Sequence, residues 1–258
     1  MKQFTNQLLP IFLTVLTFFV LVIFLHGFIS LLNLFPTRGK IELILLPADI
    51  LIGLTIYLKT SIDFALFLGK LMSRFPGWKK SIAIEVGTSL GNGIGTLLIL
   101  TIWTFFKEIP LLLFGMIVLA SLVLFRLAEE SLKFKPLLFF NKLFSPITSF
   151  LIPKAVMQKN SALGFMGLLF FSITIPFVLG LDDFAGYIPL FTIVNVFGFS
   201  VGVLLGHMLL TTALFANPQK TIAIIRLHAV EVFGSIVFIG LGLWGLVEAA
   251  QILFRIIQ

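Results

Sequence analysis

Ionisable side chains inside otherwise apolar stretches are the residues of this sequence best suited to do chemistry. In chain order they are Asp63, Glu85, Asp182, Asp183 and His207. An ionised group at the centre of a hydrocarbon layer costs about 2.5 to 3.5 kcal/mol, so each of them needs a partner or a function. Carboxylates beside hydroxyl and carbonyl oxygens suit hard divalent cations, and the same carboxylates can carry protons.

Asp63 and Asp182 are the predicted centre of a cation site. If the cation is a metal, we expect these two carboxylates to be its ligands. The residues expected to support contact with a substrate or coupling ion are Thr60, Ser61, Glu85, Asn92, Asp183 and His207. His207 has two interpretations, because a single histidine in a membrane span makes a hydrogen bond between helices more often than it binds an ion.

Structural roles would explain some of these charges without a cation. Lys59 lies four residues before Asp63, so the two can pair on one helical face. Asp182 and Asp183 can instead occupy a solvated extracellular turn. Three more ionisable residues lie near predicted membrane interfaces, where solvation is a sufficient explanation: Asp49, His228 and Glu231.

Gly87, Gly91 and Gly95 repeat every four residues and lay a stripe of small residues along one helix face. Such a stripe lets a second helix pack closely, and packing is its simplest interpretation. Close approach would also carry Glu85 toward Asp63. The run Gly91-Asn92-Gly93 lies inside an apolar span, which argues against a phosphate-binding loop.

The composition indicates that these side chains lie in a membrane. The 258 residues are 59% hydrophobic and 11% charged, and the mean hydropathy is +1.15. A soluble domain has about 25% charged residues, and so apolar a chain would expose large patches to water. There is no cysteine, which excludes disulfides and thiolate metal sites. No set of acid, base and nucleophile can be assembled, so we do not expect an enzyme.

Seven segments are apolar over roughly the 20 residues that a spanning helix needs. They run approximately over Leu8–Leu34, Leu43–Leu71, Ser81–Phe106, Ile109–Leu127, Leu163–Leu181, Tyr187–Phe215 and Val230–Phe254. With this threading, thirteen Lys and Arg residues fall on one face and four on the other, while Lys59 lies inside a span. Because basic residues concentrate in the cytoplasm, we expect a cytoplasmic N-terminus, and the net charge of +7 reports topology rather than nucleic-acid binding.

A shift of 119 positions aligns the sequence with itself without gaps. The polar and glycine pairs brought together are Asp63 with Asp182, Ser81 with Ser200, Gly87 with Gly206 and Glu129 with Glu248. Three spans in each copy force the second copy to enter from the opposite side, which predicts inverted repeats of the kind found in secondary transporters. The predicted units are an extra N-terminal helix (1–40), a first three-helix repeat (41–128), a basic cytoplasmic connector (129–161) and a second three-helix repeat (162–258).

Three short motifs resemble the cadmium-resistance transporter family of the lysine-exporter superfamily. They are Thr60-Ser61-Ile62-Asp63, the run Leu181-Asp182-Asp183-Phe184-Ala185-Gly186-Tyr187-Ile188-Pro189, and Val237-Phe238-Ile239-Gly240-Leu241-Gly242-Leu243-Trp244. The resemblance covers roughly Leu43–Ala250 and implies cation export, with Asp63 and Asp182 nearest the substrate. This chain departs from the family at three positions. Phe64 follows Asp63 where the family usually has an acidic or amide residue, Asp183 replaces an Asn, and Glu85 replaces a Gln. The absence of cysteine argues against cadmium itself, because soft ions favour thiolates.

The sequence as a whole therefore predicts an all-α, multi-pass exporter in the plasma membrane of a prokaryote, without a bound cofactor. Its substrate would be a divalent metal ion or a cationic amino-acid-like solute, exchanged for protons or another ion. Its partners would be the lipid bilayer and a small cation, and a homodimer is compatible with the sequence. The alternative is a membrane scaffold or assembly factor in which Lys59 and Asp63 are a structural pair.

Overall fold

The structure, a computed structural model, describes residues 2–36, 39–132, 163–179, 187, 190–192, 194–225 and 227–257. These residues fold into helices and contain no β-strand, which confirms the all-α prediction for the described ranges. The helices are α1 (Lys2–Leu32), α2 (Pro47–Thr60), α3 (Ile62–Arg74), α4 (Trp78–Phe106), α5 (Pro110–Leu132), α7 (Phe165–Leu179), the 3-10 turn η3 (Leu190–Thr192), α9 (Val196–Ala216), α10 (Pro218–Ile225) and α11 (His228–Ile257).

Four helices in the described ranges are long and apolar enough to cross a membrane. They are α1 over Leu8–Leu32, α4, α9, and α11 over Gly234–Ile257, and α2 with α3 makes a fifth if the bent pair is one span. The apolar parts of α5 and α7 are shorter, at Pro110–Arg126 and Phe165–Phe177. Each of the seven predicted segments thus contains a helix, while the count of seven spans stays a prediction.

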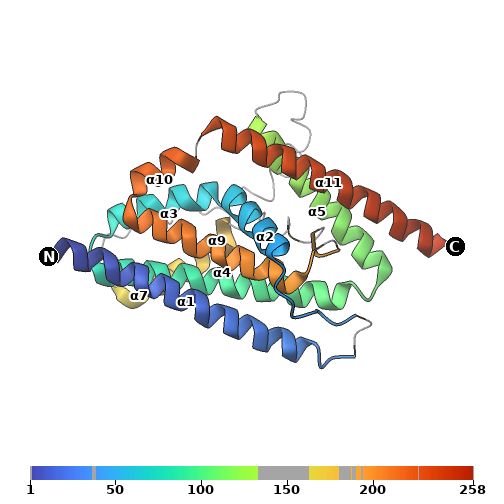
Figure 1. The fold of residues 1–258 in the computed structure, drawn as a ribbon, viewed down its shortest axis with the longest axis horizontal. Helices are drawn as coiled ribbons and strands as arrows, with labels where there is room; N and C mark the ends of the chain where they lie inside the picture. The colour runs from blue at the N-terminus through green and yellow to red at the C-terminus, as the bar shows by residue number, and fades with distance from the viewer. Residues whose placement is uncertain are drawn as a thin grey trace.

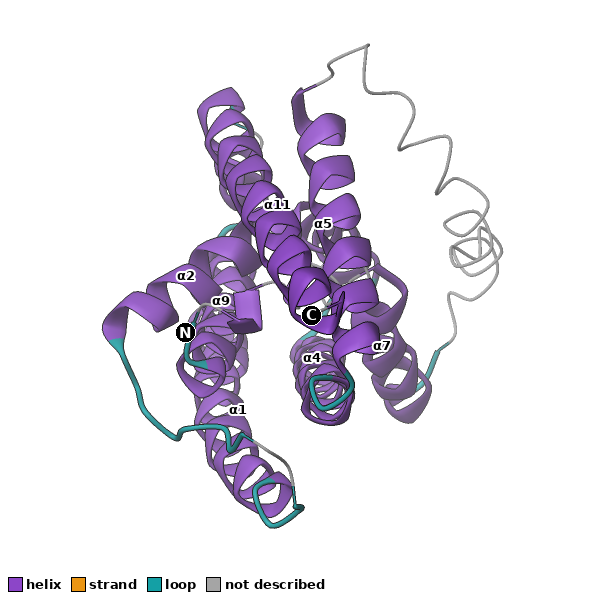
Figure 2. Cartoon of the chain, turned by 90° about the vertical axis from the view of Figure 1, so that its right-hand side faces the viewer, coloured by secondary structure: helices purple, strands orange, loops and turns teal. Residues whose placement is uncertain are grey.

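Two helix pairs and one covering helix form the packed centre of the molecule. Helix α2 packs along α9, α4 packs along α7, and α1 lies across α4 and α9 (Figure 1). Helices α5 and α11 pair mainly with each other (Figure 2). The N-terminal helix is therefore part of the core packing, although the sequence places it outside the repeat.

Glycines bring the two pairs into close contact. A Cβ placed on Gly202 of α9 would come within 2.2 Å of the Ile50 carbonyl oxygen on α2. On α4, a Cβ at Gly91 would come within 2.3 Å of the Ile173 carbonyl oxygen on α7, and Gly87 is equally crowded by that helix. Packing is thus confirmed as a role of the predicted stripe at Gly87 and Gly91, and the partner is α7.

The predicted span over residues 43–71 is broken at Ser61. Helix α2 ends at Thr60, α3 begins at Ile62, and the two axes differ by 64°. Pro47 at the start of α2 explains where that helix begins, since proline fits the first turn. Because Lys59 and Asp63 lie on either side of the break, the premise that they share one helical face is wrong. The side chain of Asp63 lies outside the described part of the chain.

Helix α9 begins at Val196, nine residues later than the predicted start at Tyr187. The reason is a helix cap. The side chain of Asn195 accepts a hydrogen bond from the Gly198 backbone N–H at 2.9 Å, and its amide donates to the Glu42 carbonyl oxygen at 3.0 Å. The cap therefore fixes both the first turn of α9 and its position beside the segment that leads into α2.

Asp49 is buried, so the prediction that solvation accounts for it is wrong. Its side chain is only 7% exposed. It lies in the first turn of α2, where the helix dipole stabilises a negative charge, and it packs against Gly198 of α9. The side chains of His228 and Glu231 lie outside the described residues.

Candidate functional site

A chain of four buried polar side chains crosses the packed centre. Tyr57 of α2 and His207 of α9 are hydrogen-bonded, with 2.7 Å between Tyr57 Oη and His207 Nδ1. His207 Nε2 lies 3.1 Å from Ser89 Oγ on α4. Ser89 Oγ donates in turn to Glu85 Oε1 over 3.0 Å. We call these residues, Tyr57, His207, Ser89 and Glu85, the buried polar chain.

Local sequence spacing and close helix packing position the buried polar chain. Glu85 and Ser89 are four residues apart, so they lie on one face of α4. Gly206 precedes His207, and a Cβ there would come within 2.8 Å of the Tyr57 ring. The absence of that Cβ lets α2 approach α9 until the phenol oxygen reaches the imidazole.

Both ring nitrogens of His207 are engaged by this chain. The ring is buried, at 3% exposed, and it also packs against the ring of Phe64 at 5.6 Å between centroids. The prediction that His207 makes hydrogen bonds between helices is therefore confirmed. No ring nitrogen is left for an ion in this arrangement, which disfavours the alternative of an ion ligand.

Glu85 is the last member of the buried polar chain. It is fully buried, at 0% exposed. Its Oε2 atom has no hydrogen-bond partner, and no basic side chain among the described residues forms an ion pair with it. The hydroxyl groups of Thr14 and Thr17 of α1 lie beside the carboxyl group. These hydroxyls already donate to backbone carbonyls of α1, at 2.9 and 2.7 Å. A buried carboxyl group without an ion-pair partner among the described residues is suited to hold a proton.

Thr60 and Ser61 lie at the break between α2 and α3. The Thr60 hydroxyl donates to the carbonyl oxygens of Ile56 and Tyr57, at 3.1 and 3.2 Å. Ser61 is 2% exposed, and its hydroxyl has no hydrogen-bond partner. The break therefore places an unsatisfied polar group in the packed centre, one helical turn from Tyr57.

Asn92 is the second predicted site residue on α4, after Glu85. Its side chain is 3% exposed, and its amide nitrogen has no hydrogen-bond partner. It is not a member of the buried polar chain. Asn92 lies less than one helical turn beyond Ser89 on α4, so its amide group could contact a ligand bound next to the buried polar chain.

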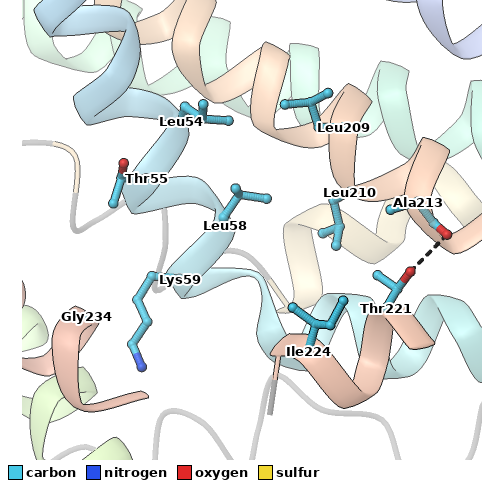
Figure 3. Close-up of a pocket in the computed structure, with 10 residues that line it drawn as sticks. All are labelled: Leu54, Thr55, Leu58, Lys59, Leu209, Leu210, Ala213, Thr221, Ile224 and Gly234. Carbon is cyan, nitrogen blue, oxygen red and sulfur yellow. Dashed lines mark hydrogen bonds between the residues drawn. The ribbon is translucent and has the colours of Figure 1, made fainter. Parts of the chain in front are cut away.

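Lys59 borders a separate cavity of about 480 Å³ between α2, α9, α10 and α11. The walls are mostly apolar, and Figure 3 shows the lysine side chain extending from α2 toward Gly234 of α11. A Cβ at Gly234 would come within 2.1 to 2.3 Å of the aliphatic carbons of Lys59. The lysine is 6% exposed, so its stem is packed against α11.

The carboxylates of the predicted cation centre belong to Asp63 and Asp182, supported by Asp183. Asp182 and Asp183 lie outside the described residues, as does the side chain of Asp63. Among the described residues, no three His, Asp or Glu side chains are grouped so that they could hold a metal ion. Asp63 and Asp182 as metal ligands thus remain a prediction.

Sequence reasoning missed Tyr57, Ser89 and the two threonines of α1. The chain has only two tyrosines, and one of them precedes the Thr60-Ser61 motif by a single turn. The spacing of Glu85 and Ser89 was a second usable signal. The glycine series at 198, 202 and 206, with the same four-residue period as the stripe on α4, was a third.

The site as described can hold a buried carboxyl group, bond it through a serine to an imidazole, and connect that imidazole to a phenol on another helix. Hydroxyl, imidazole and carboxyl groups in hydrogen-bond contact are able to exchange protons. No protein-family model, curated protein or solved structure matches the chain, so its function has to be inferred from this chemistry.

Proposed function

We propose that this protein is a multi-pass membrane transporter that exports a small cation by alternating access between two inverted three-helix repeats. The observation that carries the proposal is the buried polar chain. An ionisable carboxyl group inside apolar helices is costly, and in membrane proteins such groups mark ion and proton pathways. The buried polar chain joins α2 and α4 of the first half to α9 of the second. Secondary transporters have their binding sites at this interface between the two repeats.

Helix bounds support the repeat. A shift of 119 carries α2 onto residues 166–179, and α7 spans Phe165–Leu179. The same shift carries α4 onto 197–225, the extent of α9 and α10 together, and α5 onto 229–251 within α11. Apart from α3, whose shifted range 181–193 lies mostly outside the described residues, the helices of the first half thus have counterparts in the same order in the second half.

Reciprocal packing also supports the repeat. Helix α2 of the first half packs on α9 of the second, and its counterpart α7 packs on α4, the counterpart of α9. Ile50 and Leu169, which differ by 119, each present a carbonyl oxygen to a glycine on the opposite long helix. An approximate twofold relation between the halves accounts for this exchange.

The break at Ser61 supports a binding site next to the buried polar chain. Discontinuous helices in transporters expose backbone carbonyls and amides at the level where the substrate binds. The resemblance to the cadmium-resistance transporters falls on the same residues, Thr60 to Asp63. We therefore place the cation near the break, with Asp63 and Asp182 as its proposed contacts and the N-terminus in the cytoplasm.

Flux through reconstituted vesicles tests this function. The purified full-length protein is incorporated into liposomes, and efflux of Mn²⁺ and of radiolabelled lysine is followed with and without a pH gradient. We expect flux of at least one probe above that of protein-free vesicles, and a loss of ten-fold or more in Glu85→Gln. Glu42→Gln, at an exposed loop position, is the matched control and should keep full flux. Wild-type flux equal to protein-free vesicles for both probes would contradict the proposal.

A scaffold is the second candidate, and the packing of Lys59 against Gly234 favours it. A buried lysine whose stem is held by a neighbouring helix is suited to a structural ion pair, which would here join Lys59 to Asp63 across the break between α2 and α3. Exchanging the two residues, Lys59→Asp with Asp63→Lys, separates the candidates. If Lys59 and Asp63 form a structural pair, the exchanged protein should keep the thermal stability of the wild type. If Asp63 binds a transported cation, the exchanged protein should lose cation flux.

A further inference from the structure

We infer that the buried polar chain is a proton relay, with Glu85 as the group that stores the proton and His207 as a neutral imidazole that passes it on. The inference rests on the proposed function in one respect, that the proton is then the coupling ion of the transporter. The relay itself follows from three consecutive hydrogen bonds, each between groups that both donate and accept.

The first arrangement of protons has Glu85 ionised. Ser89 then donates its hydroxyl proton to Glu85 Oε1, as the geometry shows. Because the serine proton is committed, Ser89 Oγ accepts from the Nε2–H of His207. The other ring nitrogen, Nδ1, is unprotonated in this tautomer and accepts from the Tyr57 hydroxyl.

The second arrangement follows when one proton enters at Tyr57. Tyr57 passes its hydroxyl proton to Nδ1 and takes up the incoming one, His207 passes its Nε2 proton to Ser89, and Ser89 passes its own to Glu85. Every hydrogen bond in the chain is now reversed in direction. Glu85 has become a neutral carboxylic acid, His207 is neutral in its other tautomer, and one proton has been gained in total.

Glu85 is suited to be the terminal store of that proton. It is fully buried, and its Oε2 atom has no hydrogen-bond partner in the described structure. The nearby hydroxyls of Thr14 and Thr17 donate to the backbone carbonyls of Pro10 and Leu13, and rotation of either hydroxyl would turn its proton toward the ionised carboxylate. Neither protonation state of Glu85 therefore requires the surrounding helices to unfold.

Other ionisable groups occur on α4 and on the helices around it. Helix α7 carries none over Phe165–Leu179, and on α1 His26 lies nine residues beyond Thr17, against the ring of Phe197. The ionisable residues on the remaining neighbours are Lys79 and Lys80 at the start of α4, Asp49 and Lys59 on α2, Asp63, Lys70 and Arg74 on α3, and Arg126, Glu129 and Glu130 on α5. The ammonium group of Lys79 lies over the ring of Trp78, and that of Lys80 lies over the ring of Phe75.

The relay connects Glu85 to the broken helix. Tyr57 lies one turn before Ser61, and its backbone carbonyl accepts from the Thr60 hydroxyl. The direction of the bond between Tyr57 and His207 therefore changes at the end of α2 whenever Glu85 gains or loses its proton. A cation bound at the break and a proton on Glu85 would be coupled through α2.

The tautomer of His207 tests the relay directly. A variant with His26→Gln and His228→Gln leaves His207 as the single histidine, so ¹⁵N solid-state NMR in liposomes reports its two nitrogens alone. Infrared spectroscopy follows the carbonyl band of the protonated Glu85 carboxyl group. This band is identified by its absence in Glu85→Gln. We expect the proton to move from Nε2 to Nδ1 as the pH falls, with the same midpoint as the Glu85 band. In Ser89→Ala the band should still titrate while the tautomer no longer follows it.

Several outcomes would overturn the relay. They are a tautomer that stays constant while Glu85 titrates, a carboxyl band that never titrates, a doubly protonated imidazole, and a Ser89→Ala protein that switches like its parent. The experiment needs no substrate, so its failure is separate from that of the transporter. Cation flux with a constant tautomer would reject the relay alone, and a tautomer switch in a protein without flux would reject the transporter alone.

Discussion

Glu85 shows at the scale of one residue why a buried charge points to function. Its carboxyl group makes one hydrogen bond and leaves a second oxygen without a hydrogen-bond partner in a fully buried position. A residue kept only for stability would be replaced to advantage by a neutral one, since an unsatisfied buried polar group costs about 1 to 3 kcal/mol. Stability and function should therefore respond in opposite directions to its neutralisation.

We predict that Glu85→Gln keeps the thermal stability of the protein or raises it by about 1 kcal/mol. The glutamine oxygen can still accept from Ser89, and its amide group can donate to the hydroxyl oxygen of Thr14 or Thr17. Thermal unfolding in detergent at neutral pH measures the effect, with Glu42→Gln as the exposed control. A lowered unfolding temperature in Glu85→Gln alone would mean that the carboxylate is a structural group.

At the scale of the helix, the sequence predicted which segments are helical but not how they are interrupted or paired. Apolar length is enough to locate all seven segments, and Asn195 could have indicated the start of α9. The break at Ser61 contains neither proline nor glycine, so no local signal predicts it. The contact between His207 and Ser89 joins residues 118 positions apart, and only the packing of α9 on α4 brings them together.

Glycine contacts between helices give a prediction with an internal control. Gly202→Ala should destabilise the protein by about 1 to 3 kcal/mol, because its Cβ would meet the Ile50 carbonyl oxygen, which cannot rotate away. Gly240→Ala on α11 has nothing within 4 Å of the added carbon and should be neutral or stabilising by up to about 1 kcal/mol. Thermal unfolding of both variants measures the difference, and equal effects would contradict the close packing of α2 on α9.

At the scale of the whole molecule, contacts between distant segments show which connections lie together at each end of the helix bundle. Lys107 donates to the Gly39 carbonyl oxygen, and Asn195 donates to that of Glu42, so three connections meet at one end. Partial burial there lowers the pKa of Lys107. Helix α10 packs on α3 through Ile222 and Gly69 at the other. The loop-charge prediction assigns the first end to the outside and the second to the cytoplasm, in agreement with this grouping.

The absence of native cysteine makes the proposed threading directly measurable, because each introduced cysteine is then the sole thiol of the chain. We predict that Lys40→Cys and Ile109→Cys react with a membrane-impermeant maleimide in intact cells. Ser73→Cys, Lys142→Cys and Lys220→Cys should react only after permeabilisation. The pair at 109 and 142 tests whether α5, whose apolar part covers only Pro110–Arg126, crosses the bilayer, since both positions would label from one side if it did not. Labelling of 73 or 220 in intact cells would contradict the proposed threading.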